Sequence, residues 1–406
     1  MGITSKQTEV VKCIEKENPK ILICSGAKRS GKTFILTYAF INHIAKYKNK
    51  GYSFILGGTN QASIRRNVLD DLEKILGHDI KLKSDNHFRM FGNKIYCFDG
   101  ANADSYKKLR GFTSFGAFLN EATTLHDTFI KEAISRCSGE GARIYMDTNP
   151  ENPTHTVKVD YIDKDGQRLK NGQLNIKSFS FTIFDNTFLN DEYIESIIAS
   201  TPSGMFTDRD IYGNWVASEG VVYKDFNKNI HYISKAEAKK KQYKKYFVGV
   251  DFGWEHYGAM VVVGKTTNDE YVLLREYAYK HKHIDEWIDI ANSIKKEYGN
   301  IFFYCDYSRP DYINKLASKG IKGINANKEV LQGISTISKL FKTNKLFVVK
   351  ENINLFNIEI YNYIWAKGKD EPIKKNDDIM DSLRYAIHTD IKLHGGNNFD
   401  RTKYGI

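Results

Sequence analysis

Short apolar and β-branched runs alternate with longer, helically periodic segments through the first half of the chain. The runs predict strands at residues 21–24, 52–57, 94–98, 115–120 and 143–148. Among them, apolar residues recur with helical spacing at residues 34–46, 62–76 and 128–136. This alternation is typical of a mostly parallel α/β sheet, which binds its ligands at the carboxyl ends of the strands.

A second pattern begins near Tyr246. Residues 247–251, 258–265 and 270–279 are consecutive strand-like runs joined by short turns, which predicts an antiparallel meander. Helices are then expected at 284–298, 311–319 and 333–343, and strands at 301–306, 321–326 and 346–349. Two helices follow, of which the last strong one is expected at 377–389.

These patterns divide the chain into a first domain at residues 1–212, a linker at 213–245, a second domain at 246–395 and a flexible tail at 396–406. The linker contains a basic run between Lys235 and Lys245, which we interpret as a solvated, charged face. Contact of these lysines with DNA is the alternative interpretation.

Composition limits the kind of protein. A chain of 406 residues has room for two or three domains, and 41% hydrophobic with 13% aromatic residues excludes a disordered chain. The 60 basic against 49 acidic residues give a formal charge of +11. A surplus of this size suits a polyanionic partner.

The five cysteines contain no C-x-x-C pair and predict buried thiols in a reducing compartment. No apolar run approaches the roughly 18 residues that a transmembrane helix needs, and the N-terminus lacks a secretory signal pattern. We therefore expect an intracellular protein with no membrane partner.

A phosphate-binding pattern, G-x-x-x-x-G-K-[ST], separates the first predicted strand from its helix, as Gly26-Ala27-Lys28-Arg29-Ser30-Gly31-Lys32-Thr33. In such a loop the backbone N–H groups turn toward phosphates, and the helix N-terminus adds positive potential. Lys32 reaches the β- and γ-phosphates, and the Thr33 hydroxyl holds Mg²⁺. The loop alone does not choose among kinases, GTPases and motor ATPases.

Ala117-Phe118-Leu119-Asn120-Glu121 is an apolar strand that ends in a polar and an acidic residue, as a Walker B element does. Glu121 is placed to polarise the attacking water. Asn120 occupies the position that normally carries the Mg²⁺-binding Asp. Its carbonyl can accept a hydrogen bond from a metal-bound water but brings no charge, and whether this weakens Mg-ATP binding stays open.

Two further features suit nucleotide hydrolysis. Thr148 and Asn149, at the end of the next strand, can sense the γ-phosphate, although a plain turn explains the Asn-Pro step equally well. Cationic charge at the phosphoryl group can come in cis from Lys28 and Arg29, or in trans from Arg110 across a subunit boundary. An ordinary surface arginine is the alternative for Arg110.

The second domain carries carboxylates where a metal site needs them. Asp251 and Asp306 each end an apolar strand, and Asp377, Asp378 and Asp381 lie on the last helix. Asp378 and Asp381 share a helix face, with Asp377 beside Asp381. Carboxylates gathered in this way suit two Mg²⁺ or Mn²⁺ ions roughly 4 Å apart, which cleave phosphodiesters. Solvent-exposed acids are the alternative, and the choice between Asp377 and Asp378 stays open.

Taken together, the chain resembles the large subunit of a tailed-bacteriophage or prophage DNA-packaging terminase over nearly its whole length. Further matching segments are Phe184-Asp185-Asn186, Gly213-Asn214-Trp215, Glu219-Gly220-Val221-Val222-Tyr223 and Asp381-Ser382-Leu383-Arg384-Tyr385. Gln7 matches the glutamine that such proteins use near the adenine. Two positions depart from the family: Asn120 replaces the usual Asp, and Asp378 stands where related members often have His.

The resemblance implies an α/β protein with a P-loop (ASCE-type) ATPase domain followed by a ribonuclease-H-like nuclease domain. Lys32, Glu121 and Arg110 would then be catalytic for ATP, and Asp251, Asp306 and Asp381 for DNA, with ATP and Mg²⁺ or Mn²⁺ as cofactors. Such proteins drive double-stranded DNA into a procapsid and cut concatemeric DNA in the host cytoplasm. Implied partners are DNA, the portal protein, the small terminase subunit and, in a docked ring of otherwise monomeric chains, further copies.

Two other functions fit parts of the pattern. A nucleic-acid helicase or translocase would use the first domain and keep the second as a structural element. A non-catalytic scaffold would bind nucleotide only to dock a partner and would show no turnover.

Overall fold

The structure is a computed structural model, which describes residues 2–375 and 377–394. The chain forms two compact units. The first comprises residues up to Ile198 together with Met205–Ala217, and the second comprises Ala199–Gly204 and the chain from Ser218 onward. The predicted tail at 396–406 lies outside the described residues. Among the helices that are described, none combines the length and apolar character needed to cross a membrane.

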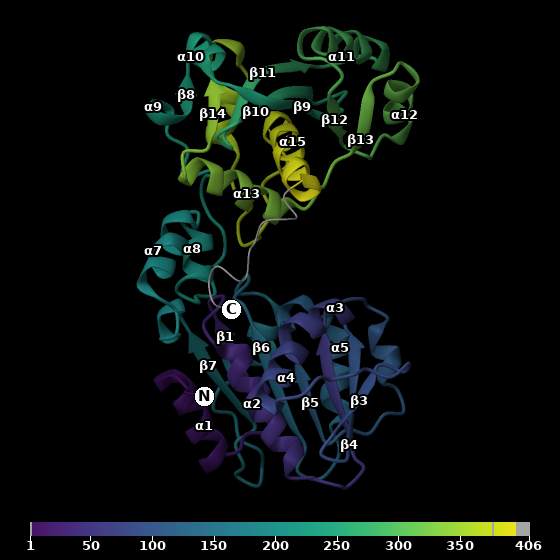
Figure 1. Cartoon of the computed structure of the whole chain (residues 1–406), viewed down its shortest axis with the longest axis vertical. Helices are drawn as coiled ribbons and strands as arrows, with labels where there is room; N and C mark the ends of the chain where they lie inside the picture. Colours follow the sequence, from purple (N-terminus) through teal and green to yellow (C-terminus); the bar gives the residue numbers. More distant parts are fainter. Residues whose placement is uncertain (1, 376, 395–406) are drawn as a thin grey trace. The chain divides into compact units, whose positions relative to one another are not determined.

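The first unit is built on a seven-stranded sheet in the order β3-β4-β2-β5-β6-β1-β7 (Figure 1). Its strands are β1 (Ile21–Gly26), β2 (Ser53–Gly58), β3 (His87–Met90), β4 (Asn93–Asp99), β5 (Gly116–Leu119), β6 (Arg143–Thr148) and β7 (Ile176–Phe181). All neighbouring strands pair in parallel except β3 and β4. The P-loop strand β1 and the Walker B strand β5 are separated by β6, as the ASCE arrangement requires.

The α-helices of the first unit are α1 (Ser5–Lys16), α2 (Lys32–Ala45), α3 (Gln61–Ile64), α4 (Asp70–Leu76), α5 (Asp127–Arg136), α6 (Thr156–Asp160), α7 (Asp191–Ser200) and α8 (Met205–Asp210). A π-helical segment, Arg65–Leu69, joins α3 to α4. Short 3-10 turns lie at Ser105–Leu109, Ala122–Thr124, Ile162–Lys164 and Ile183–Asp185.

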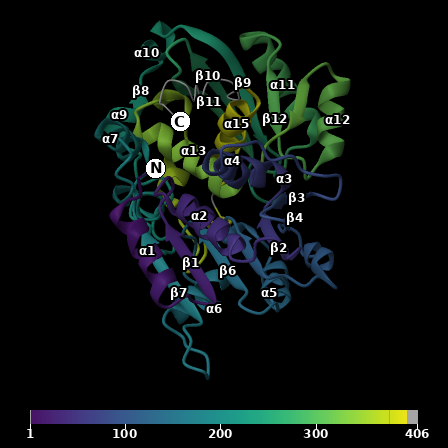
Figure 2. The ribbon, with the colours of Figure 1, turned by 60° about the horizontal axis from the view of Figure 1, so that its bottom comes forward.

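Helices cover both faces of this sheet. On one face α2 packs across β1, β5 and β6 (Figure 2). The Phe40 ring of α2 is enclosed by Phe54, Phe118 and Tyr145. On the other face α5 buries Phe129 and Ile130 against the opposite side chains of the strands. Because both faces are covered, the strands read as continuous apolar runs, and their carboxyl ends are left to carry polar residues.

The second unit contains another seven-stranded sheet, in the order β13-β12-β9-β10-β11-β14-β8. Its strands are β8 (Tyr232–Ile233), β9 (Tyr243–Asp251), β10 (Gly258–Thr266), β11 (Tyr271–Tyr279), β12 (Phe302–Cys305), β13 (Lys322–Asn325) and β14 (Leu346–Val349). β9, β10 and β11 form the predicted antiparallel meander, and the remaining pairs are parallel. This is the predicted ribonuclease-H-like arrangement.

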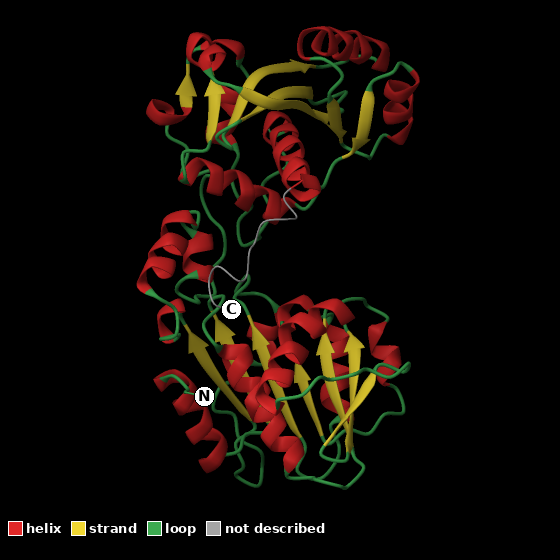
Figure 3. Ribbon diagram, viewed as in Figure 1, coloured by secondary structure: helices red, strands yellow, loops and turns green. Residues whose placement is uncertain are grey.

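The helices of this unit are α9 (Lys228–His231), α10 (Lys235–Lys240), α11 (Ile284–Tyr298), α12 (Pro310–Ser318), α13 (Val330–Lys342), α14 (Phe356–Asn362) and α15 (Asp378–His394), with a 3-10 turn at Lys350–Asn352. α11 buries Trp287 and Ile288 on one face of the sheet. α15 packs on β9 and β10, next to α13 and α14 (Figure 3). A Cβ on Gly249 would lie 1.8 Å from the Ser382 carbonyl oxygen, so α15 meets β9 at backbone distance.

The segment expected to be a linker, residues 213–245, differs from that expectation. From Ser218 onward it belongs to the second compact unit, and β8 pairs with β14 as an edge strand. The basic run forms α10 and the start of β9, and three of its lysines are ion-paired: Lys241 with Glu270, Lys244 with Asp269 and Lys245 with Asp390. Neutralisation by these acids explains how a run of lysines is accommodated in folded structure.

Candidate ATPase and nuclease sites

The phosphate-binding loop connects β1 to α2 and is tightly packed. Gly26 has φ 150°, and a Cβ there would lie 2.0 Å from the Phe181 carbonyl oxygen. Gly31, the N-cap of α2, has φ 87°, and a Cβ there would lie 2.7 Å from Nε2 of Gln7. Both conformations favour glycine, and both approaches exclude a side chain. The pattern's two glycines are therefore required by this backbone path.

Lys32 is only 6% exposed, at the start of α2. Its Nζ donates to the Ala27 carbonyl oxygen at 2.9 Å and to Oδ1 of Asn149 at 2.8 Å. Burial lowers the pKa of Lys32, and the nearby carboxylate of Asp147 opposes the shift. The predicted loop lysine and the predicted sensor Asn149 are thus in direct contact.

Asp147, at the carboxyl end of β6, is 1% exposed and receives several hydrogen bonds. The Thr33 hydroxyl donates to Oδ2, the Asn120 amide nitrogen lies 3.0 Å from Oδ1, and the Glu121 backbone N–H donates to Oδ1 at 2.9 Å. Sequence reasoning gave Asp147 no role. The signal for it was an acidic residue closing an apolar strand next in sequence to the Walker B strand.

Glu121 follows β5 in a left-handed backbone conformation, with φ 52°. A non-glycine residue there is uncommon and is concentrated at functional sites. Burial and then the charge of Asp147 raise the pKa of Glu121, while Lys32 and Arg66 lower it. A raised pKa suits a carboxylate that accepts a proton from water.

Thr148 lies beside the Glu121 turn, as predicted for a sensor position. Its hydroxyl donates to the Thr123 hydroxyl at 2.9 Å and accepts from the Thr123 backbone N–H at 3.2 Å. The structure therefore brings Lys32, Thr33, Asn120, Glu121, Thr148 and Asn149 together at one end of the sheet. Hydroxyl and carboxylate oxygens at Thr33, Asp147 and Glu121 are the hard ligands that Mg²⁺ prefers.

The two cations inside the loop turn toward helices α7 and α8. Nζ of Lys28 lies 2.9 Å from Oδ2 of Asp210, and the Arg29 guanidinium lies over the Tyr193 ring, 5.3 Å from its centre. The hydroxyl of the next residue, Ser30, is buried and has no hydrogen-bond partner among the described residues. The loop thus keeps one unused polar group, while its flanking cations are held by protein partners.

Of two arginines outside the loop, Arg110 and Arg66, only Arg66 lies near Glu121. Arg110 is exposed and donates to the Tyr106 hydroxyl at 3.3 Å, over whose ring it stacks, so it is not part of the cluster at Glu121. Arg66, on the π-helical segment, is near enough to affect Glu121 electrostatically, and the next residue, Asn67, donates to Oδ1 of Asn120 at 3.1 Å. Nothing in the sequence indicates Arg66, because its apolar pattern predicts an ordinary helix here and does not reveal the π-helical turn.

Gln7 is buried against the same loop. Its Nε2 donates to the Gly31 carbonyl oxygen at 2.9 Å, and its Oε1 accepts from the Thr4 backbone N–H at 2.9 Å. The Thr4 hydroxyl caps α1 in return. Gln7 therefore fixes α1 to the phosphate-binding loop, and its amide is engaged by protein groups.

In the second unit, Asp251 ends the central strand β9 and Asp306 follows the adjacent strand β12. The Asp306 backbone N–H donates to the Val250 carbonyl oxygen at 2.9 Å, which sets the two acids side by side. Burial, and then the charges of Asp381, Asp306, Asp378 and Asp377, raise the pKa of Asp251 well above its usual value. No group in the described part of the chain donates a hydrogen bond to the Asp251 carboxylate.

The other acids have partners. Asp306 accepts from Nζ of Lys328 at 2.6 Å and from Ser308, and these donors outweigh burial and lower its pKa. Asp381 lies 2.9 Å from Nη2 of Arg384. Asp378 lies 2.6 Å from Nδ1 of His256, and burial raises its pKa. Burial, together with Asp381 and Asp378, raises the pKa of Asp377 to about 6.

As these side chains stand, no three histidine, cysteine or acidic residues among those described are grouped closely enough to hold a metal ion. Lys328, Arg384 and His256 each draw one carboxylate toward a cationic or imidazole partner. The chemistry of the donor set nevertheless fits a divalent cation, because Asp251 is a carboxylate without a partner that faces four further carboxylates.

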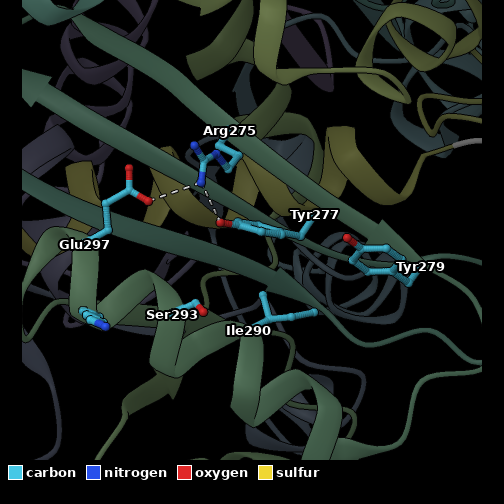
Figure 4. Close-up of a pocket in the computed structure, with 7 residues that line it drawn as sticks. Arg275, Tyr277, Tyr279, Ile290, Ser293 and Glu297 are labelled. Atoms are coloured by element: carbon cyan, nitrogen blue, oxygen red, sulfur yellow. Dashed lines mark hydrogen bonds and ion pairs between the residues drawn. The ribbon is translucent and has the colours of Figure 1, made fainter.

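A separate pocket lies elsewhere on the second unit, between β11 and α11 (Figure 4). Arg275 bridges the Tyr277 hydroxyl and the Glu297 carboxylate at 3.2 Å each. The residues that line it, among them Ile290 and Ser293, lie on the side of the sheet that α11 covers, whereas α15 covers the other. This pocket is therefore distinct from the acidic cluster around Asp251.

Comparison with known protein families decides the identity. The family profile described as "Terminase large subunit, T4likevirus-type, N-terminal" matches residues 23–230, more than half of the chain. The chain belongs to the terminase large subunit family. No curated protein sequence matched it.

Solved structures of large terminases cover almost the whole chain. The large terminase of a thermophilic bacteriophage is 26% identical, with a TM-score of 0.82 over 97% of this chain and 100% of that one. The same protein in complex with ADP gives 27% identity and a TM-score of 0.79, over 97% and 100% of the two chains. Its complex with ATP-γ-S gives 27% and 0.76, over 95% and 98%. The terminase fold therefore extends through both units.

Family membership gives the His256–Asp378 contact a context. The sequence resemblance led us to expect a histidine in related members at the position of Asp378, and in this chain His256 approaches that acid from the loop between β9 and β10.

Proposed function

We propose that this terminase large subunit hydrolyses ATP to drive double-stranded viral DNA into a procapsid, and cuts concatemeric DNA with a divalent-metal-dependent nuclease. The observation that carries the proposal is the presence of two separate acidic centres in one chain. One adjoins a phosphate-binding loop, and the other surrounds Asp251 on a ribonuclease-H-like sheet. The large terminase of the thermophilic bacteriophage, solved with ADP and with ATP-γ-S, supports a nucleotide as the ligand of the first centre.

In the first centre the resident contacts indicate how the loop responds to a nucleotide. The Lys32 ammonium exchanges its bonds to Ala27 and Asn149 for the phosphate oxygens. Asn149 is then released, which couples the occupancy of the loop to the end of β6. Glu121, with its raised pKa, orients the attacking water and takes up its proton. Bound Mg²⁺ would be held through Thr33 and would neutralise phosphate charge.

In the second centre, carboxylates of the chain would hold metal ions at one scissile phosphate. Asp251, Asp306 and Asp381 are proposed to hold the metal ions, with Asp378 as a further ligand. Bound Mg²⁺ or Mn²⁺ would stabilise the attacking and leaving oxygens of the phosphodiester. Lys328, which now pairs with Asp306 and is partly exposed, is a cation that can turn toward the DNA backbone when Asp306 takes up metal, whereas the buried Arg384 stays beside Asp381.

The proposal extends to partners. The excess of basic residues suits sequence-tolerant, salt-dependent contacts with DNA phosphates. A ring of copies docked on the portal protein would let the exposed Arg110 of one subunit reach the nucleotide of its neighbour. The small terminase subunit would recruit viral DNA, and the whole assembly would act in the host cytoplasm.

Incubation with plasmid DNA tests the nuclease part of this function. We expect nicked or linear DNA with Mn²⁺ or Mg²⁺ and intact plasmid with EDTA. Asp306→Asn should remove cleavage, whereas Asp285→Asn, an exposed acid paired with Lys315 in the same unit, should not. Intact plasmid under all conditions, with ATP hydrolysis retained, would instead favour a helicase or translocase with a structural second domain.

A further inference from the structure

Asp147 is the one carboxylate on which the loop threonine, the Walker B strand and the catalytic glutamate converge. Its oxygens accept from the Thr33 hydroxyl, from the Asn120 amide at 3.0 and 3.1 Å, and from the Glu121 backbone N–H. No lysine, arginine or histidine within the described ranges forms an ion pair with it. A carboxylate that is 1% exposed and held only by neutral donors has no paired cation to displace before it binds a metal ion.

The strand register explains how this carboxylate comes to the loop. β5 and β6 run in parallel with Leu119 opposite Met146, so Asn120 and Asp147 are the next residues along each strand. P-loop ATPases place an acidic residue at the end of the Walker B strand, where this chain has the neutral Asn120. The acidic Asp147 lies at the same level on the adjacent strand, β6. The carboxylate charge at this level of the sheet therefore comes from β6 in this chain, and not from β5.

The orientation of Asn120 agrees with this exchange. Its Oδ1 accepts from Nδ2 of Asn67 at 3.1 Å, so its Nδ2 is directed at Asp147. Asn120 therefore acts as a donor toward the carboxylate, and its oxygen does not face Thr33. This differs from the sequence-based expectation that the Asn120 carbonyl would serve the metal's water shell.

We propose that Asp147 supplies the carboxylate of the Mg-nucleotide centre, with Asn120 holding it in place. The inference rests on the proposed ATPase function and deepens it. It assigns the Walker B acid's role to a residue on a different strand, and it makes Asn120 a positioning residue instead of a metal-site ligand.

A reciprocal exchange of the two side chains tests the proposal in the full-length chain. The variants are Asp147→Asn, Asn120→Asp and the double exchange Asn120→Asp with Asp147→Asn. Asp104→Asn, an exposed acid of the same unit, is the control for loss of one charge. The measurement is the affinity for ATP-γ-S by calorimetry in Mg²⁺ and in EDTA, together with the melting temperature of the nucleotide-free protein.

We expect Mg²⁺ to strengthen ATP-γ-S binding by wild type and by Asp104→Asn. Asp147→Asn should lose about tenfold or more of this enhancement, because hydrogen bonds and contacts that involve a charge are the strong ones. Its affinity in EDTA should not fall, since one negative charge near the phosphates has been removed. The double exchange should regain most of the enhancement, because it returns a carboxylate to the same level of the sheet.

A solely structural Asp147 gives different results. Asp147→Asn would then lower the melting temperature yet keep the Mg²⁺ enhancement, and either that outcome or a double exchange without recovery overturns the inference. If Asp147→Asn does not fold, the double exchange decides alone, since it retains both a carboxylate and an amide. Wild type that fails to bind ATP-γ-S would overturn the proposed ATPase function itself, which is a separate result.

Discussion

His43 lies on α2, enclosed by Tyr47, Phe54 and Tyr145 and 4% exposed. Its Nε2 is 2.8 Å from the Phe115 carbonyl oxygen. Burial lowers its pKa from 6.5 to about 4, with the Phe115 carbonyl opposing the shift. Between these two values the unfolded chain binds a proton that the folded chain excludes, so stability falls as the pH falls.

We therefore predict that His43 costs the fold about 2 kcal/mol between pH 7 and pH 5, from its pKa difference. Urea unfolding of wild type and His43→Gln at each pH measures this, because other titrating groups are common to both proteins. The stability advantage of wild type over the variant should shrink toward pH 5. An advantage that is the same at both pH values would show that His43 does not titrate in this way.

At the scale of single residues, sequence patterns found the functional positions that have a fixed spacing. Gly26, Lys32 and Thr33 belong to one continuous motif, and Glu121 follows a strand whose apolar run is evident. Asp147 also follows an evident apolar run, but its contacts with Thr33 and Asn120 depend on the register between β5 and β6, which the pattern of one strand does not contain. Arg66 escaped because only the π-helical turn brings it near Glu121.

At the scale of elements, two glutamates, the half-buried Glu276 and the buried Glu359, hold successive helices of the second unit. Glu276 accepts from the backbone N–H groups of Asn354, Leu355 and Phe356 at the start of α14. Glu359 on α14, itself fully buried, accepts from Ile379 and Met380 at the start of α15. Carboxylates at helix N-termini accept hydrogen bonds from the unpaired N–H groups and interact favourably with the positive end of the helix dipole. This chain of contacts fixes the turn that carries Asp378 and Asp381.

We predict that Glu359→Ala lowers DNA cleavage by roughly tenfold or more, since it frees the turn that aims two acids and small misplacements are costly. Glu359→Gln retains an acceptor for the same N–H groups and should keep most of the activity. Plasmid cleavage rates and ATP hydrolysis rates of both variants provide the measurement. Equal cleavage by Glu359→Ala and wild type, or loss of ATP hydrolysis as well, would contradict this role.

The sequence predicted most elements because their apolar periods are clear, including the meander and the alternating helices and strands after it. It did not predict β7, whose half-exposed edge position leaves polar residues within Ile176–Phe181. It also assigned residues 213–245 to a linker, because β8 has only two residues and α10 is short and charged. The position of β8 is set by its pairing with β14, and Lys245 at the start of β9 is held by an ion pair with the distant Asp390, neither of which local composition reveals.

At the scale of the whole molecule, each acidic centre is built on its own sheet and its own hydrophobic core. The hydrogen bonds described for Lys32 and Glu121 stay within the first unit, and those of Asp306, Asp378 and Asp381 stay within the second. The chemistry of ATP hydrolysis and that of DNA cleavage are therefore expected to be separable by substitution.

The most direct test measures both activities on the same preparations of Lys32→Ala and Asp251→Ala. We predict that Lys32→Ala loses ATP hydrolysis on the order of 10²-fold or more and retains Mn²⁺-dependent cleavage of plasmid, and that Asp251→Ala does the reverse. Either substitution disabling both activities in a folded protein would contradict the existence of two separate centres.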